Sequence, residues 1–84
     1  MRKYLVDLRS KAGFSQRRVA RDSGLSYQHY ARLESGERGG KVSFLTMGRI
    51  AEVFSVSLDS LYPLEKEYQE SLELKLERRK WNEH

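Results

Sequence analysis

Apolar residues recur every three or four positions along most of the chain, and serine or glycine interrupts the pattern at short intervals. This period is typical of an α-helix with one buried face, and no stretch alternates apolar and polar residues as a half-buried strand does. Serine is a favoured N-terminal cap of helices, and glycine closes helices because it adopts left-handed backbone angles at little cost. The pattern therefore predicts an all-α fold made of short helices.

Five helices follow from this punctuation. The first carries Leu5 and Leu8 and ends at Ala12-Gly13, and the second runs from Gln16 to about Ser23. The starts of the second to fifth helices are predicted by four capping serines: Ser15, Ser26, Ser43 and Ser57. The inward-facing residues of helices two to five are expected to be Val19, Ala20, Tyr30, Leu33, Leu45, Met47, Ile50, Ala51, Phe54, Leu58 and Leu61.

A further amphipathic helix is expected at the C-terminal end. Pro63 suits the first turn of a helix, where the missing N–H would have no intrahelical acceptor. One stripe at i+4 spacing then consists of Leu64, Tyr68, Leu72 and Leu76. Leu74 and Trp81 fall on nearly the opposite side. We therefore divide the chain into a domain over residues 1–62 and a C-terminal helical extension over residues 63–84.

The connection between the second and third helices is very short. Only Gly24, Leu25 and Ser26 separate them, which favours a helix-turn-helix over an antiparallel hairpin. On the third helix, Gln28 and Arg32 point away from the inner face. Glutamine can pair with adenine and arginine with guanine through two hydrogen bonds each. This outer face is compatible with reading DNA bases, and also with an ordinary solvated surface.

Charge is distributed unevenly along the 84 residues. Residues 1–50 carry eleven Lys/Arg and four Asp/Glu, a net charge of +7, whereas residues 51–84 carry five and eight, a net charge of −3. A basic half of this kind favours a polyanionic partner. Residues 51–84, with their net negative charge, do not favour such a partner.

Several classes of protein are disfavoured by the composition. The chain has no cysteine and two histidines, so neither disulfides nor a metal site is expected, and no cofactor is predicted. No nucleophile, base or paired carboxylates are arranged as an enzyme would need them. There is no apolar run long enough to span a bilayer and no signal peptide, so we expect a soluble, cytoplasmic protein.

A set of positions across residues 2 to 62 resembles the helix-turn-helix domain of the Cro/C1-type (XRE-like) transcription regulators. The matching residues are Gln16, Val19-Ala20, Gly24-Leu25-Ser26, Tyr30, Leu33-Glu34, Gly36 and the stretch Ser55-Val56-Ser57-Leu58-Asp59-Ser60-Leu61. The resemblance implies a five-helix, lambda-repressor-like DNA-binding domain whose third helix enters the major groove of double-stranded DNA. With the C-terminal helix added, this is the fold that we expect.

The resemblance also implies roles for particular residues. Three occupy base-reading positions: Tyr27, Gln28 and Arg32. Five are expected to bind phosphates: Gln16, Arg17, Arg38, Lys41 and Ser43. Arg9 and Glu34 are expected to form a buried ion pair that fixes the scaffold without touching bases.

Three features depart from the family pattern. Tyr30 is bulkier than the usual aliphatic residue, so either the helices sit slightly apart or its hydroxyl reaches the surface. The linker over residues 37–42 contains two adjacent glycines and is longer than usual. Ser55 replaces a glycine, at a cost of about 1 kcal/mol if the left-handed conformation is kept.

These observations predict a sequence-specific DNA-binding transcriptional repressor that works as a homodimer. The dimer is expected to form through the C-terminal helix: Leu64, Tyr68, Leu72, Leu74, Leu76 and Trp81. The alternative for this helix is to fold back on its own domain. The alternatives for the function are a DNA-binding antitoxin and a protein-binding adaptor on the same fold.

Overall fold

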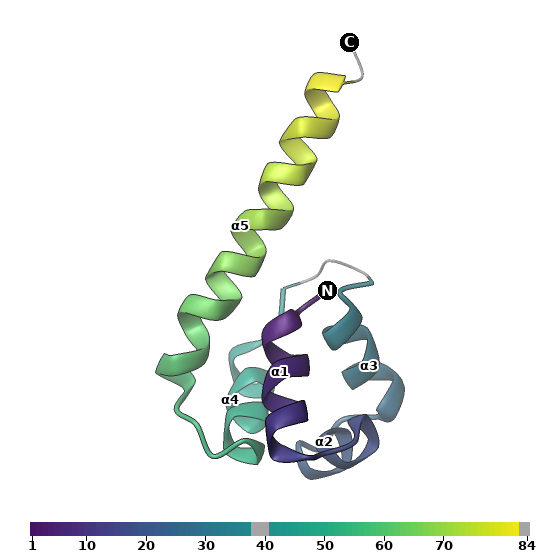
Figure 1. The fold of residues 1–84 in the computed structure, drawn as a ribbon, viewed down its shortest axis with the longest axis vertical. Helices are drawn as coiled ribbons and strands as arrows, with labels where there is room; N and C mark the ends of the chain where they lie inside the picture. The colour runs from purple at the N-terminus through teal and green to yellow at the C-terminus, as the bar shows by residue number, and fades with distance from the viewer. Residues whose placement is uncertain (38–40, 83–84) are drawn as a thin grey trace.

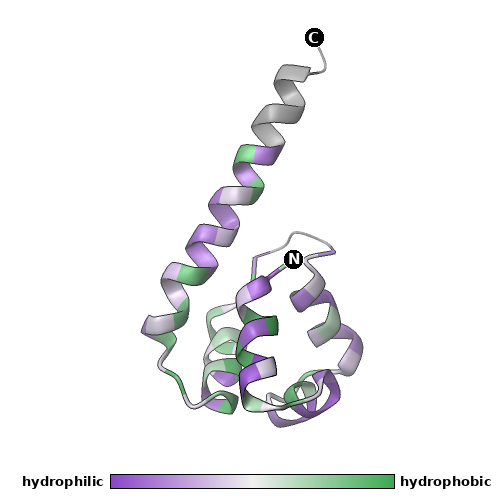
Figure 2. Cartoon of the chain, viewed as in Figure 1, coloured by the Kyte–Doolittle hydropathy of each residue, from purple (hydrophilic) through white to green (hydrophobic). Residues whose placement is uncertain are grey.

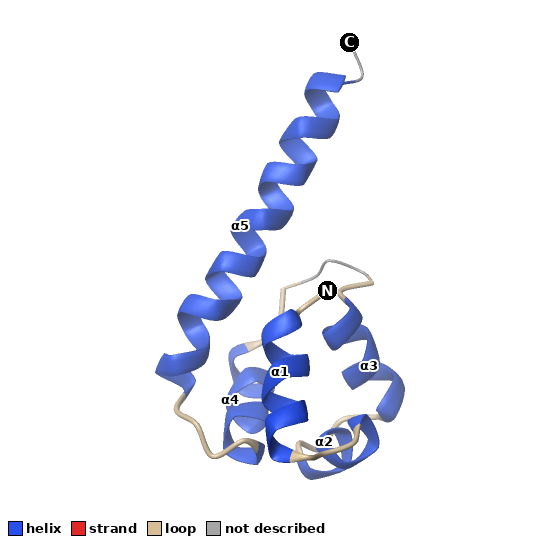
Figure 3. Cartoon of the chain, viewed as in Figure 1, coloured by secondary structure: helices blue, strands red, loops and turns tan. Residues whose placement is uncertain are grey.

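The fold was analysed in a computed structural model, which describes the backbone of residues 1–37 and 41–82 and the side chains of residues 1–37 and 41–75. The described residues form five helices and no strand (Figure 1, Figure 3): α1 (Lys3–Ala12), α2 (Gln16–Asp22), α3 (Tyr27–Ser35), α4 (Phe44–Val53) and α5 (Leu58–Asn82). Helices α1 to α4 form a bundle, and α5 runs beside it and projects well beyond it (Figure 1). The predicted all-α fold is confirmed.

The helix ends follow the serine and glycine punctuation. The Oγ atoms of Ser15, Ser26 and Ser43 accept hydrogen bonds from backbone N–H groups three residues later, at 3.1 to 3.2 Å. Gly13 closes α1 in the left-handed conformation, with φ of 71°. Ser55 also has a positive φ, 55°, so the expected strain at this position is present.

The core consists of two neighbouring clusters of buried side chains. One joins α1, α2, α3 and α4 and contains Leu5, Val19, Ala20, Tyr30 and Ile50. The other joins α4 to the start of α5 and contains Met47, Ala51 and Leu61. Most of the predicted inward-facing residues lie in or against these clusters. Leu45 does not, because the first turn of α4 lies at the edge of the bundle and leaves this side chain 62% exposed.

Tyr30 is fully buried, which excludes the sequence-based alternative that its hydroxyl reaches the surface. Its hydroxyl does not reach the surface, and it has no hydrogen-bond partner of ordinary geometry among the described residues. The additional volume of the ring is therefore accommodated inside the core, between α3 and the helices that pack on it.

The C-terminal segment is helical as expected, but it does not begin a new helix at Pro63. Helix α5 runs without interruption from Leu58 to Asn82, with Pro63 inside it. The proline removes only the hydrogen bond to the carbonyl of Asp59. Asp59 and Pro63 are both exposed, so water can satisfy this carbonyl and the helix continues. Over residues 65–75, α5 is mainly hydrophilic (Figure 2).

A polar cluster fastens α5 to the bundle, and the sequence did not predict it. We call Arg2, Tyr4, Glu65 and Tyr68 the Arg2 cluster. The Arg2 side chain is 2% exposed and forms an ion pair with Glu65, with 2.9 Å between Nε and Oε1. The hydroxyl of Tyr4 donates to the same carboxylate at 2.6 Å. The Arg2 guanidinium also lies 4.5 Å from the ring centroid of Tyr68.

The same arginine also binds the C-terminal end of α3. Its Nη1 donates to the carbonyl of Leu33 at 2.7 Å, and its backbone N–H donates to the carbonyl of Glu34 at 2.8 Å. Gly36 ends α3 so close to the Tyr68 hydroxyl that a Cβ there would lie 2.2 Å from it. The C-terminal end of α3 is therefore held by both α1 and α5.

Candidate nucleic-acid interface

Helix α3 has one buried and one exposed face. Tyr30 and Glu34 lie inside, at 0% and 3% exposure. The three predicted base-reading residues, Tyr27, Gln28 and Arg32, are all exposed. Gln28 and Arg32 are one helical turn apart, so their side chains lie next to each other on the outer surface. Helix α3 can thus present two groups capable of paired hydrogen bonds to a surface outside the bundle.

The Arg9–Glu34 pair holds this helix from behind. Two parallel hydrogen bonds join the guanidinium and the carboxylate, from Nη2 to Oε1 at 2.9 Å and from Nε to Oε2 at 3.0 Å. Gln16 at the start of α2 donates to the same carboxylate at 3.0 Å. Glu34 therefore connects α1, α2 and α3, and fixes the position of the exposed face.

Burial and hydrogen bonding have opposite effects on the pKa values of the Glu34 and Glu65 carboxylates. Burial alone would raise the pKa of Glu34, but hydrogen bonds from Arg9 and Gln16 outweigh it and hold the pKa below its ordinary value. For Glu65, burial is likewise outweighed by Arg2, Tyr4 and Gln69, so its pKa is also lowered. Burial, reinforced by these carboxylates, raises the pKa of Tyr30 and Tyr4.

These shifts predict how stability depends on pH. A carboxylate whose pKa is lower in the folded state stabilises the fold above its unfolded pKa, and this contribution is lost as pH falls through the folded value. We expect the free energy of unfolding to be nearly constant from pH 7 to about 5 and to decrease below the ordinary pKa of 4.5. Urea denaturation at a series of pH values measures this. Glu65→Gln, with one such group fewer, should show a shallower decrease, and an equally steep one would contradict the assignment.

A hollow of about 430 Å³ lies at the start of α2, beside the exposed face of α3. It is lined by Arg9, Ser15, Gln16, Arg17 and Tyr27. The Arg17 guanidinium lies 4.3 Å from the ring centroid of Tyr27. The hydroxyl of Tyr27 donates to Oε1 of Gln16 at 3.4 Å. The guanidinium of Arg17 and the N-terminal end of α2 thus meet in one open depression, which is a suitable environment for an anion, whereas the charge of Arg9 is already paired with Glu34.

The other expected phosphate contacts lie near the start of α4. Lys41 and Ser43 are both exposed there. The Oγ of Ser43 accepts from the Thr46 N–H and donates to Oγ1 of Thr46, so this hydroxyl serves as the helix cap. The N–H groups of Phe44 and Leu45 are the first of the helix and have no intrahelical acceptor. Arg38 lies outside the described residues.

Fold and site together define a helix-turn-helix DNA-binding domain, in which α2 and α3 form the motif. The family model described as Helix-turn-helix matches residues 5–61. Because this match covers more than half of the 84 residues, the chain belongs to the Cro/C1-type, XRE-like helix-turn-helix family of DNA-binding transcription regulators. Neither the curated proteins nor the solved structures give a match.

Two aspects of the site were not predicted from the sequence. Ser15 and Arg9 line the hollow beside the predicted phosphate ligands, although Arg9 was expected to act only through Glu34. The Arg2 cluster depends on residues 63 positions apart, and no local spacing links them.

Within the described part of the chain, no helix is long and apolar enough to cross a membrane.

Proposed function

We propose that this protein is a sequence-specific transcriptional repressor that binds double-stranded DNA as a homodimer and reads the major groove with α3. The observation that carries the proposal is the exposed pair Gln28 and Arg32 on a helix whose opposite face is fixed by Glu34. Arginine reads guanine and glutamine reads adenine through bidentate hydrogen bonds in the major groove. Residues one turn apart can reach adjacent base pairs, and Tyr27 lies beside them at the start of the helix.

Phosphate contacts on both sides of α3 would set its position on the DNA. The hollow at the start of α2 supplies Arg17 and Gln16, and Tyr27 orients both of them. Lys41 and the backbone N–H groups after Ser43 supply the other side. Contacts of this kind fix the register of the protein but carry little sequence information.

A homodimer would give such a small domain useful affinity, because two recognition helices about 34 Å apart can enter the same face of DNA. The exposure of α5 residues supports a dimer contact on its outward side. Tyr68 packs within its own chain and Leu72 is partly buried, whereas Leu64 and Leu74 are 39% and 58% exposed. Leu76 and Trp81 lie in α5, but their side chains are outside the described residues.

An apolar groove of about 480 Å³ favours a DNA-binding antitoxin as the second candidate function. It lies between α4 and α5, and its apolar lining consists of Val42, Phe44, Met47, Leu58 and Tyr62. Phe44 and Tyr62 are 79% and 65% exposed, and exposed apolar surface of this kind can bind a protein partner. Selection of binding sites from random DNA distinguishes both candidates from a protein-binding adaptor. A repressor and an antitoxin would each enrich a DNA sequence, whereas an adaptor without DNA affinity would enrich none.

We expect Arg32→Ala to relax sequence preference at one base pair by about 1 to 3 kcal/mol, because the bidentate contact to the base is lost. Binding to the selected duplex and to single-base variants of it, measured by titration, gives this difference. Lys41→Ala removes the same charge from an expected phosphate contact and serves as the matched control. It should weaken all duplexes by similar factors and reduce the salt dependence of binding.

Equal losses for selected and random DNA in the Arg32→Ala variant would contradict the assignment of Arg32 to base reading. The pattern for Lys41→Ala tests the phosphate assignment separately. A variant of Lys41 that lost discrimination at one base pair would show that the two roles are reversed.

A further inference from the structure

Six residues of α5 form a seam with alternating spacings of three and four. The seam consists of Leu64, Glu67, Ser71, Leu74, Arg78 and Trp81. Residues with this spacing follow a stripe that winds slowly around a helix, and such a stripe forms the contact line of two-stranded coiled coils. The four seam residues whose side chains are described are all exposed. Leu74 is 58% exposed, although it is large and apolar.

The seam lies next to the face of α5 that packs on the bundle, and the two faces share no residue. That inner face consists of Leu61, Glu65, Tyr68 and Leu72, which are buried or partly buried. Helix α5 thus has two faces with apolar residues, and its own domain covers one of them. On this second face Leu64 and Leu74 are exposed apolar residues that a partner can cover.

We infer that the seam binds the seam of a second copy, with the two α5 helices antiparallel. This inference rests on the homodimer proposed above and specifies its contact. With a two-fold axis between residues 72 and 73, Leu64 faces Trp81 of the partner subunit. Glu67 faces Arg78 of the partner subunit, and Ser71 faces Leu74 of the partner subunit. The pairing then joins an apolar residue to an apolar one, an acid to a base and a small residue to a large one, and the contact is the same for both copies.

Charge decides the orientation. Residues 58–74 of α5 carry five carboxylates and one lysine, whereas residues 75–82 carry four bases and one carboxylate. A parallel pair would place Glu67 beside Glu67 and Arg78 beside Arg78, which is repulsive at both positions. An antiparallel pair places the acidic part of each helix beside the basic part of the other. The small Ser71 opposite Leu74 also lets the helices approach closely.

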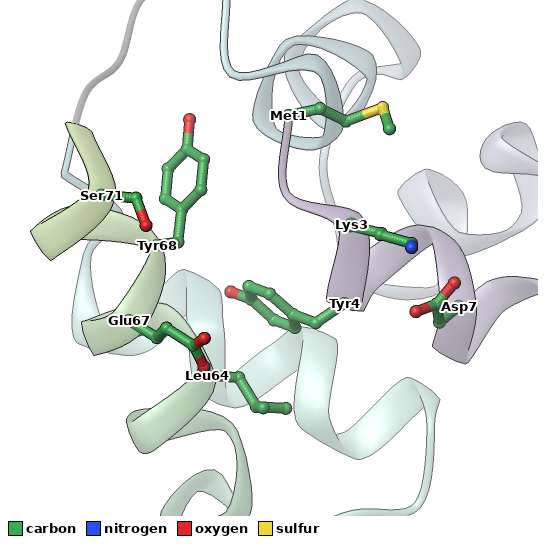
Figure 4. A pocket seen from close by; sticks show the side chains of 8 residues that line it. All are labelled: Met1, Lys3, Tyr4, Asp7, Leu64, Glu67, Tyr68 and Ser71. Atoms are coloured by element: carbon green, nitrogen blue, oxygen red, sulfur yellow. The ribbon is translucent and has the colours of Figure 1, made fainter. Parts of the chain in front are cut away.

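A groove of about 310 Å³ between α1 and α5 receives the end of the partner helix in this arrangement. Its α5 side is lined by Leu64, Glu67 and Ser71 of the seam and by Tyr68 of the inner face, and its α1 side by Met1, Lys3, Tyr4 and Asp7 (Figure 4). Glu67 and Asp7 place carboxylates on both walls, with Lys3 as the opposing charge. The basic C-terminal end of the second α5 is complementary to these carboxylates, and Trp81 of the partner subunit would lie over Leu64.

Charge exchange tests the proposed pairing. Glu67→Arg and Arg78→Glu should each weaken dimerisation of the full chain by roughly tenfold, because each creates two like-charge contacts per dimer. The double variant should return to within about threefold of the original chain. Positions 67 and 78 are about 16 Å apart along one helix, so they cannot compensate each other within a single copy. Sedimentation equilibrium at low salt measures the dissociation constants.

Glu73→Arg is the matched control, because it makes the same charge change on an exposed residue of α5 outside the seam. It should leave the dissociation constant within about twofold of the original, the effect of an isolated surface charge. Circular dichroism of every variant confirms that α5 is intact before the comparison is made.

Disulfide trapping gives an independent measure of orientation, since the chain has no cysteine of its own. In the antiparallel pair the two copies of position 67 are about 16 Å apart, too far for a disulfide. Glu67→Cys alone and Arg78→Cys alone should therefore stay uncrosslinked under mild oxidation. An equimolar mixture of the two should give a disulfide-linked dimer.

Self-crosslinking of Glu67→Cys would overturn the antiparallel orientation. A dimer that shows neither charge rescue nor crosslinking of the mixture would overturn the seam and leave the proposed dimeric repressor intact. A monomer at micromolar concentration would overturn both the seam and the dimer. DNA recognition by α3 is tested separately by Arg32→Ala.

Discussion

Glu34→Ala should lower the free energy of unfolding by about 3 kcal/mol. Glu34 is 3% exposed and accepts hydrogen bonds from both Arg9 and Gln16, so its removal leaves two donors inside the fold without an acceptor. Breaking a buried ion pair from one side costs about 3 to 5 kcal/mol. The Arg9 side chain is 22% exposed and gains some hydration, which places the loss at the lower end.

Urea denaturation of the variant measures this loss, and Asp22→Ala is the control. Asp22 pairs with Arg21 at 3.1 Å and with Arg18 at 3.6 Å, all with exposed side chains, and surface pairs of this kind contribute at most about 1 kcal/mol each. A change below about 0.5 kcal/mol for Glu34→Ala would show that the pair is no more important than a surface pair. The folded fraction of the variant should select the same DNA sequence, because Glu34 touches no base in the proposed complex.

Arg2→Ala should be destabilising by a similar amount, about 3 to 5 kcal/mol. The variant would leave the Glu65 carboxylate, whose side chain is 17% exposed, without its cation. It would also remove the donor to the carbonyl of Leu33 and the cation above the Tyr68 ring. Chemical denaturation followed by circular dichroism measures the loss.

Arg2→Lys provides the matched comparison. It keeps the charge but cannot make the two hydrogen bonds of Arg2 to Glu65 while also reaching Leu33. We expect an intermediate stability for this variant. If Arg2→Lys were as stable as the original chain, the contribution of Arg2 to stability would come from its charge alone. A loss under about 1 kcal/mol for Arg2→Ala would refute the structural role of the Arg2 cluster.

The local part of the fold could be predicted because the signals are local. A capping serine and the N–H that it accepts are three residues apart, and the left-handed glycine after α1 is adjacent to the helix that it closes. The helix-turn-helix connection and the outward position of Gln28 and Arg32 follow from spacing in the same way. The one error of this kind is Leu45, which has the right period but lies at the edge of the bundle.

Apart from the Arg9–Glu34 pair, which the family resemblance implied, contacts between distant residues could not be predicted from the sequence. Arg2 looks like an ordinary terminal base, and its burial depends on where Glu65 is placed by the path of α5. The expectation of a new helix at Pro63 failed for a related reason. A proline strongly favours the first turn of a helix, yet one missing hydrogen bond at an exposed position is outweighed by the docking of α5 on both sides of it.

The uninterrupted α5 has a consequence for operator architecture. The helix is joined to the C-terminal end of α3 through Arg2 and is continuous through Pro63. In a dimer joined through α5, Arg2 would tie the DNA-reading helix directly to the helix that forms the subunit contact. Adding one base pair between half-sites rotates one of them by about a tenth of a turn around the DNA axis. A rigid connection cannot follow that rotation, so such a repressor would recognise the spacing of its half-sites as strictly as their sequence.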